Sequence, residues 1–350
     1  MKPATRFMNF PQPSFFICGM GNRRKLLFRE GVLSDARSGE IVRRWDAKNI
    51  EIAPHEYSCR WQTPENDWVA LREDETGVWL HENAGQTLLS EGYVSLPRFE
   101  GHPHQRLLRA LHAEILVNIV GGEPVPNFLV YDKAWYRDAA SMAMCLDKTG
   151  NLHLIENWIR NLRGPFDLNN KGNREPDNLG QLLYLISLVG DDSHPLVATI
   201  LEAAETFRRD DFIIGLSDYG EHPVYQTKWL KFGLRALKLP DCYQIPAVFD
   251  SYSALFWMDF RQSHVDGAGF SAAEGEDYPY LAWAQAHFHG APPPFHLLGE
   301  NYPLTWEGAA SEANYEGMKI VYPAYLERRL CAPHTWHAAE AFLYLGELNA

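Results

Sequence analysis

The spacing of apolar residues changes near residue 100, and this change constrains the fold more than any other feature. Before it, short runs such as residues 68–72 alternate apolar and polar side chains, and Gly, Asn, Asp and Pro separate the runs. This pattern is typical of antiparallel strands. After it, apolar residues such as Leu107 and Leu111 recur every four positions, as on one buried helix face. We therefore predict a small antiparallel β-rich domain of about five strands over residues 1–98 and a helical domain over residues 99–350.

The second part contains about ten apolar stripes, which predict about ten helices. Loops rich in Trp, Tyr, His and carboxylates connect them, and these polar and aromatic residues gather at helix starts. A solenoid would show self-similarity at a fixed period, and none is found. We therefore predict a mainly α fold, an (α/α) toroid of stacked helical hairpins with one functional face. After the first stripe, which Gly121-Gly122 terminates, the stripes lie at residues 134–148, 151–163, 177–190, 194–208, 224–238, 248–262, 276–289, 306–318 and 333–348.

Composition excludes several classes of protein. The chain of 350 residues has 32 Lys and Arg against 45 Asp and Glu, a net charge of −13. Without a basic run it has no face for nucleic acid or for an anionic membrane, so neither partner is expected. No apolar run approaches the ~20 residues of a membrane span. Five cysteines without paired spacing indicate reduced thiols and a cytoplasmic protein.

Signatures of cofactor chemistry are missing as well. The sequence has no phosphate-binding loop, dinucleotide fingerprint, HExxH or GxSxG motif, so no cofactor is expected. His334 and His337 lie one helical turn apart, but no third ligand accompanies them at a characteristic spacing. We therefore predict no metal site.

The segment Trp135-Tyr136-Arg137-Asp138 is the first candidate for a site. Its two aromatic rings precede an Arg-Asp pair at a predicted helix start. Aromatic faces stack on the C–H surface of a sugar, and a charged fork binds its hydroxyl groups. The alternative is that Asp138 satisfies backbone N–H groups at the helix start and that Arg137 is its ion partner.

The loop around Glu175 and Asp177 is the second candidate. Two carboxylates and Gln181 exceed what helix capping needs, although Asp177 or Asn178 could cap the helix that begins there. Glu175 precedes a proline and is therefore expected to be extended and off the helix.

Further polar and aromatic residues recur at later helix starts. Glu307 follows Trp306 beside a helix of small residues, and it is either an acid, a base or a glutamate favoured by the helix dipole. The two histidines near the C-terminus are either ligand contacts or buried core residues. The remaining candidates for substrate contacts are Tyr225, Lys228, Trp229, Asp250, Tyr252, His334, Trp336 and His337.

With these residues in view, the helical part resembles the six-hairpin, or (α/α)6-toroid, glycosidases. The resemblance is carried chiefly by residues 135–140, which are similar to a sugar-binding segment of glucoamylase-like enzymes. It implies that Arg137 and Asp138 contact substrate at the bottom of a pocket. The acid and base motifs of those enzymes are not recognisable in this sequence.

Our leading hypothesis is a glycoside hydrolase that uses two carboxyl groups, one protonated and one ionised. The catalytic candidates are Asp138, Glu175, Asp177 and Glu307, with Glu175 or Asp177 as acid and Glu307 as base. If Arg137 and Lys228 face the pocket, a uronic acid is a natural substrate. The alternatives are a sugar epimerase or lyase that uses His222, His287, His334 or His337, and a non-catalytic carbohydrate-binding protein.

Overall fold

The computed structural model describes most of the chain. The described residues are 6–9, 13–168, 172–218, 220–248, 250, 252, 279–288, 291–292, 295–298, 320 and 334–347.

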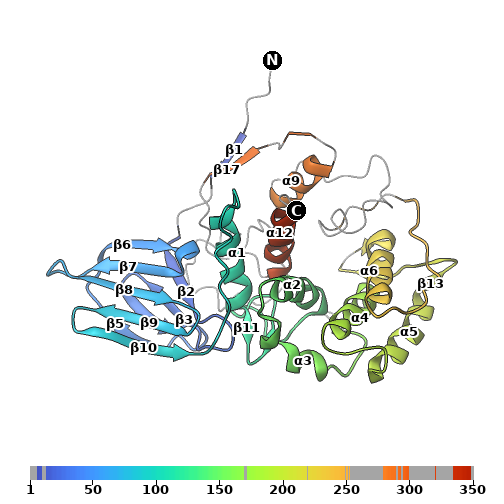
Figure 1. Cartoon of the computed structure of the whole chain (residues 1–350), viewed down its shortest axis with the longest axis horizontal. Coiled ribbons are helices and arrows are strands. Elements are labelled where there is room, and N and C mark those ends of the chain that lie inside the picture. The colour runs from blue at the N-terminus through green and yellow to red at the C-terminus, as the bar shows by residue number, and fades with distance from the viewer. Residues whose placement is uncertain are drawn as a thin grey trace, which may run out of the picture.

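Two antiparallel sheets form a sandwich at one end of the molecule (Figure 1). Where residues alternate along β8, Val69 and Leu71 point inward and Trp68 and Arg72 are exposed, as the alternation predicts. The inner faces meet through aromatic contacts, and the rings of Phe28 and Trp61 stack at 4.1 Å. The four-stranded sheet contains β2 (Phe15–Cys18), β3 (Leu26–Arg29), β4 (Val32–Asp35) and β5 (Ile41–Arg44). The five-stranded sheet contains β6 (Lys48–Ala53), β7 (Ser58–Gln62), β8 (Trp68–Glu73), β9 (Gly77–Glu82) and β10 (Gly85–Glu91).

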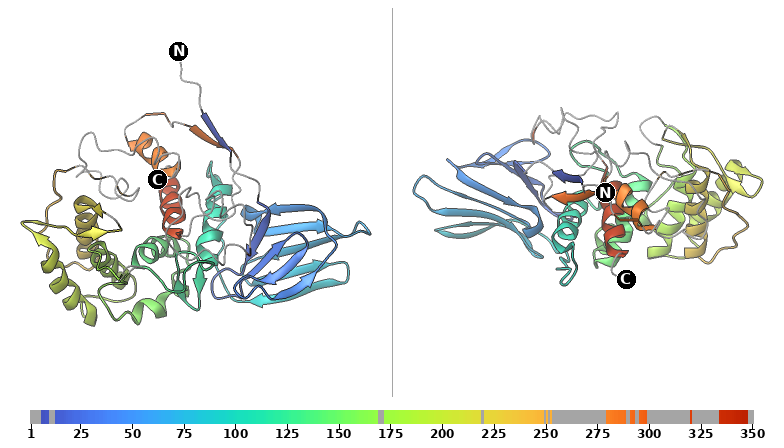
Figure 2. Two further views of the ribbon diagram at one scale, coloured as in Figure 1. Left: turned by 180° about the vertical axis from the view of Figure 1, so that it is seen from behind. Right: turned by 90° about the horizontal axis from the view of Figure 1, so that it is seen from above.

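Helices follow from residue 105 onward, and Figure 2 shows them from two further sides. α1 (Gln105–Val117) lies beside the sandwich, and its buried residues Leu107, Leu111 and Ile115 share a core with Phe15 and Tyr57. From α1 the packing continues through α12, α2, α4 and α6. The other α-helices in the described part are α2 (Tyr136–Lys148), α3 (Glu156–Arg160), α4 (Asp177–Val189), α5 (Pro195–Phe207), α6 (Pro223–Ala236), α9 (Pro279–Phe288) and α12 (Thr335–Glu347).

Short strands and turns connect these helices. Two 3-10 turns, η1 (Pro54–Glu56) and η2 (Leu152–Leu154), precede β7 and α3. β1 (Arg6–Asn9) pairs in parallel with β17 (Phe295–Leu298). Three two-stranded hairpins are formed by β11 (Ile119–Val120) with β12 (Glu123–Pro124), β13 (Arg208–Arg209) with β14 (Phe212–Ile213), and β15 (Leu216–Ser217) with β16 (Gly220–Glu221).

The prediction of a mainly α toroid is wrong. Within the described residues the fold is mixed, with eight α-helices and five antiparallel sheets. Ten strands, β1 to β10, replace the five or so predicted before residue 98, and hairpins occupy segments that sequence patterns assign to loops. The hairpin turns explain the difference, because Gly121, Gly122, Asp210 and Asp218 adopt positive φ angles that reverse the chain within a few residues. The predicted stripes 248–262 and 306–318 lie mostly or wholly outside the described residues.

The closest helix crossing brings α4 against α6. A Cβ added to Gly180 would lie 2.1 Å from the backbone carbon of Trp229, and one added to Gly233 would lie 2.5 Å from the carbonyl oxygen of Gly180. The two glycines therefore let the helix backbones touch. This contact fixes the start of α4, which carries Asp177, relative to α6.

No helix in the described part of the chain combines the length and the hydropathy needed to cross a membrane.

Candidate functional site

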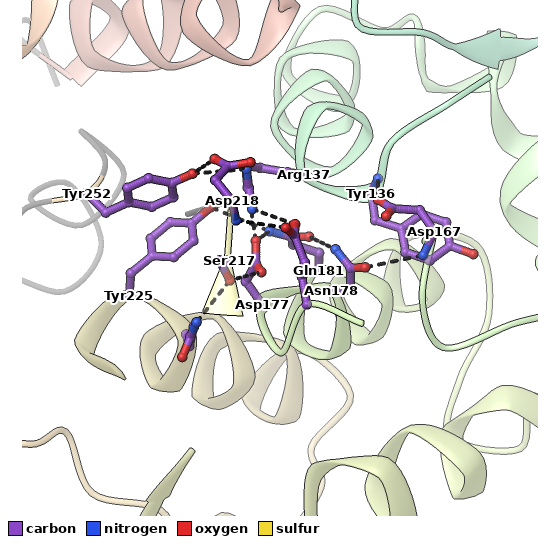
Figure 3. Close-up of polar contacts among 12 residues, drawn as sticks. Tyr136, Arg137, Asp167, Asp177, Asn178, Gln181, Ser217, Asp218, Tyr225 and Tyr252 are labelled. Carbon is purple, nitrogen blue, oxygen red and sulfur yellow. Dashed lines mark hydrogen bonds and ion pairs between the residues drawn. The ribbon is translucent and has the colours of Figure 1, made fainter. Parts of the chain in front are cut away.

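Arg137, in the first turn of α2, lies at the centre of a buried polar cluster (Figure 3). Its Nε donates to Oδ2 of Asp177 at 3.0 Å, and its Nη2 donates to Oε2 of Glu175 at 2.9 Å. Its Nη1 donates to Oδ2 of Asp218 at 2.8 Å and to the Tyr252 hydroxyl at 3.0 Å. Every nitrogen of the guanidinium is therefore bonded, and three carboxyl groups share one positive charge.

Asp177 is the anchor of this cluster. It is fully buried and accepts hydrogen bonds from the Ser217 hydroxyl and, at 2.8 Å, from Gln181 Nε2. Burial alone would raise the pKa of Asp177, but the Arg137 charge and these hydrogen bonds hold it below its ordinary value. Asp177 therefore stays ionised and is shielded from solvent, which suits a positioning role better than proton transfer.

Glu175 has the opposite character. Its Oε1 accepts a hydrogen bond of 2.7 Å from the backbone N–H of Asp218. Burial, together with the carboxylates of Asp177 and Asp218, raises the pKa of Glu175 to about 7 against the opposing charge of Arg137. Both protonation states are therefore populated near neutral pH, as a general acid and base requires.

Asp218 is the most accessible carboxylate of the three. It lies in the turn between β15 and β16 with a φ of 54°, and its side chain is 33% exposed. The Tyr252 hydroxyl donates to its Oδ2. Sequence analysis missed Asp218, although its place in an Asp-x-Gly segment is a signal for a hairpin turn.

Aromatic rings line the same side of Arg137. Trp336 and Tyr252 lie with their ring centres 5.1 and 5.4 Å from the guanidinium carbon. His222 stacks on Tyr252 at 3.9 Å and pairs with Asp250. Asp250 accepts the backbone N–H groups of Val224 and Tyr225 at the start of α6.

Asp138 lies one residue beyond Arg137 but has a different environment. Its Oδ1 accepts the backbone N–H of Trp336 at 3.0 Å, and its Oδ2 lies 3.5 Å from Nδ1 of His334. The side chain is buried. Asp138 therefore joins α2 to the start of α12 and positions Trp336.

The other candidate residues divide between the cluster and the core. Gln181 belongs to the cluster through its bond to Asp177, and it also donates to the Tyr225 hydroxyl. Lys228 and Trp229 are buried in α6, away from solvent. Trp135 packs against Tyr131 and His334, and Tyr136 faces the opposite side of α2. Trp306 and Glu307 lie outside the described residues.

A second buried group adjoins Trp336. Nδ1 of His337 lies 2.5 Å from the Tyr280 hydroxyl, and this hydroxyl donates to Oε2 of Glu340 at 3.0 Å. Burial lowers the pKa of His337 well below its ordinary value, so this histidine is neutral. Among the residues that the structure describes, no three His, Cys, Asp or Glu side chains are grouped as a metal site would need.

Comparison of the chain with protein-family models, with curated proteins and with solved structures found no match in any of the three. The resemblance to six-hairpin glycosidases is therefore wrong as an assignment of family. The motif at residues 135–140 that carried it is short, and the hairpins and sheets around it do not belong to a helical toroid.

Proposed function

We propose that this chain is a glycoside hydrolase in which Glu175 is the general acid and base and Asp218 is the nucleophile. One observation carries the proposal. A carboxyl group whose pKa is raised to about 7 lies beside a partly exposed aspartate, and both bind the same guanidinium. Two carboxyl groups in different protonation states are what glycosidic cleavage requires.

The reaction would proceed in two steps. Protonated Glu175 donates its proton to the glycosidic oxygen while a carboxylate oxygen of Asp218 attacks the anomeric carbon, and the bond to the leaving sugar breaks. Ionised Glu175 then takes a proton from water, and the resulting oxygen nucleophile displaces Asp218 from the anomeric carbon. Arg137 favours the ionised form of Asp218 and fixes its orientation.

The spacing of the two carboxyl groups supports retention of configuration. Glu175 accepts the backbone N–H of Asp218, and their side chains bind two nitrogens of one guanidinium. This proximity favours the separation of about 5–5.5 Å found in retaining enzymes over the 6.5–9.5 Å of inverting ones. The rings of Tyr252 and His222 would stack on the sugar.

The test is a proton NMR time course with neutral and uronic-acid oligosaccharides. We expect new anomeric signals, and the product that forms first should have the same anomeric configuration as the substrate. Glu175→Gln and Asp218→Asn should abolish them, whereas Glu202→Gln, an exposed glutamate on α5, should not. Inversion would exclude Asp218 as the nucleophile, and sugar binding without any cleavage would favour a binding protein.

A second candidate function is supported by the buried Tyr280, His337 and Glu340. A neutral histidine bonded to a tyrosine beside Trp336 is suited to removing a proton from carbon, as sugar epimerases and lyases do. In the same NMR experiment, deuterium uptake without cleavage, or a new alkene signal, would favour this function. His337→Asn should then abolish activity while Asp218→Asn leaves it.

We infer a cytoplasmic location from the cysteines. Cys18, Cys59, Cys145 and Cys242 are free, and the first three are buried. Reduced thiols of this kind are typical of a reducing compartment; Cys331 lies outside the described residues.

A further inference from the structure

A cavity lies on the side of the first turn of α2 that faces away from the carboxylate cluster. Its volume is about 580 Å³, within the range of about 300–1,000 Å³ typical of sites for small molecules. The turn between β11 and β12, the start of α2, α3 and the loop 161–167 form its wall. Tyr136 faces this cavity, whereas the side chain of its neighbour Arg137 enters the carboxylate cluster (Figure 3).

Aromatic and amide groups line this cavity together. The rings of Trp158 and Tyr136 lie 6.4 Å apart at an angle of 59°, and Trp158 is only partly buried. The Tyr136 hydroxyl donates to the carbonyl of Gly164 at 3.0 Å, which fixes its ring. Asn157 and Asn161 are exposed at the same wall. An aromatic surface flanked by amides suits a sugar ring, since it offers an apolar face and hydrogen-bonding groups.

The two cations of this cavity form no ion pair within the described part of the chain, although the nearby Lys133 charge opposes the rise in the pKa of Asp167. Lys133 Nζ donates to the carbonyl oxygens of Asp167 and Leu168, and Arg163 donates to the carbonyl of Leu162 and to Oδ1 of Asn161. Two acidic residues, Glu123 and Asp167, also line the cavity. Oδ2 of Asp167 accepts the backbone N–H of Tyr136 at 2.7 Å, whereas its Oδ1 is buried without a hydrogen-bond partner.

The carboxylate cluster offers no comparable place for an anion. All three nitrogens of the Arg137 guanidinium bind carboxylates, and Lys228, the other cation that sequence analysis assigned to the substrate, is buried in α6. A negatively charged sugar would therefore meet three acidic groups there. The cations that could receive its carboxylate lie instead beside Trp158.

We propose that the cavity beside Trp158 is a second carbohydrate site that binds a uronic acid residue, with Trp158 stacking on the ring and Lys133 and Arg163 facing its carboxylate. The class of ligand rests on the proposed function. A chain of hydrogen bonds joins the two sites: Asp167 N–H donates to Asn178, Asn178 donates to Gln181, and Gln181 donates to the Asp177 that binds Arg137 (Figure 3). A sugar bound in this cavity therefore contacts the start of α2, the same helix turn from which Arg137 reaches the carboxylate cluster.

The test is calorimetric titration of the full-length Glu175→Gln variant, in which cleavage is slowed, with a tetrasaccharide that alternates glucuronic acid with a neutral sugar, because we expect the carboxylate cluster to bind a neutral residue and the cavity an acidic one. We expect two molecules per chain, falling to one when Trp158→Ala is added. Trp68→Ala, which removes an exposed tryptophan of the sandwich, should leave two. Arg163→Gln should keep the fold and weaken the second site about tenfold, a loss of roughly 1.4 kcal/mol.

The outcomes separate this inference from the proposed function. One molecule per chain, lost with Trp158→Ala, would mean that the cavity binds sugar and the carboxylate cluster does not. Unchanged stoichiometry in Trp158→Ala together with unchanged affinity in Arg163→Gln would overturn the inference. It would also fall if nothing bound, or if a neutral glucose tetrasaccharide bound the second site equally well.

Discussion

Two buried arginines with acidic partners lie in the described part of the chain, one in the sandwich and one at the start of α2. Arg23 donates to Glu73 at 2.8 Å, and Glu73 also accepts the backbone N–H groups of Gly19 and Met20. Lys25 lies nearby with its ammonium group bonded to the carbonyls of Gly19 and Gly21. These contacts fix the loop at residues 19–21 to the sandwich, and the side chains of Arg23, Lys25 and Glu73 are buried.

The second cluster contains the same chemical groups in a different balance. Three carboxyl groups surround Arg137, one of them is a third exposed, and aromatic rings flank the open side. Each cluster holds one group with a pKa of about 7, Lys25 in the first and Glu175 in the second. The perturbed pKa therefore does not identify a site. What separates the clusters is that only the second places its perturbed group beside an exposed partner.

The largest expected effect is on catalysis at the second cluster. Glu175→Gln keeps the size of the side chain but removes the exchangeable proton, so kcat should fall by a factor of about 10²–10⁴. Glu73→Gln in the sandwich should leave kcat unchanged in the folded fraction. Initial rates of oligosaccharide cleavage measure both, with the exposed Glu202→Gln as control. Equal losses of kcat in Glu175→Gln and Glu73→Gln would remove the distinction between the clusters.

The next largest effect is a loss of stability caused by Glu73→Gln in the sandwich. Glu73→Gln leaves the buried cations Arg23 and Lys25 without their carboxylate, and removing one partner of a buried ion pair costs about 3–5 kcal/mol. Urea unfolding followed by circular dichroism measures the loss. The matched control is Glu30→Gln, whose side chain is 73% exposed and which should change stability by less than about 1 kcal/mol. A small effect of Glu73→Gln would show that the cluster is not a structural support.

A third variant, Gly180→Ala, changes the contact between α4 and α6 that supports the second cluster. A Cβ in Gly180→Ala would lie 2.1 Å from the Trp229 backbone, so α4 and α6 must separate, at a cost of about 1–3 kcal/mol or more. Because α4 begins at Asp177, activity should fall with stability. Gly190→Ala at the end of the same helix meets only the Ile186 carbonyl at 3.6 Å and serves as the control in urea unfolding. Equal stability of the two variants would contradict the close crossing.

Local periodicity predicted elements well but not their assembly. The apolar stripe at residues 177–190 became α4, and alternation at 68–72 became β8. The hairpins between helices were missed because two-residue strands carry no measurable alternation. They depend on single turn residues such as Asp210 and Asp218. A prediction based on the spacing of helices alone could not include these hairpins.

The candidate site was predicted in part for the same reason. Arg137, Glu175 and Asp177 stand out in the sequence because charged residues are concentrated at helix starts, and the structure brings these three together. The role of each could not be read from the sequence. Asp177 and Glu175 are two residues apart, yet the Arg137 charge and three hydrogen-bond donors keep Asp177 ionised in spite of its burial, whereas burial and like charges raise the pKa of Glu175. Those environments come from Ser217 and Asp218 on a distant hairpin.

The last expected effect is a change of stability with pH, and its sign differs between the clusters. The ordinary pKa of Glu175 is 4.5 and its folded value is about 7, so between these values the folded protein holds a proton that the unfolded chain has lost. The free energy of unfolding should therefore fall as pH rises from about 5 to 7. For Lys25, lowered by burial from 10.5 to about 7, the unfolded chain holds the extra proton above pH 7, so stability should rise from there towards pH 9.

Variants assign each slope to its cluster. Urea unfolding between pH 5 and 9 should show the falling limb disappear in Glu175→Gln and the rising limb disappear in Lys25→Met. Asp167, whose pKa burial raises to about 6, contributes to the falling limb only up to about that value, so the interval from pH 6 to 7 isolates Glu175. His112 and His337, whose pKa values burial lowers, contribute the opposite slope below neutral pH, so each variant is compared with the parent protein. If Glu175→Gln kept the falling limb in that interval, Glu175 would not be the group that changes protonation near neutral pH, and the contrast between the clusters would then depend on exposure alone.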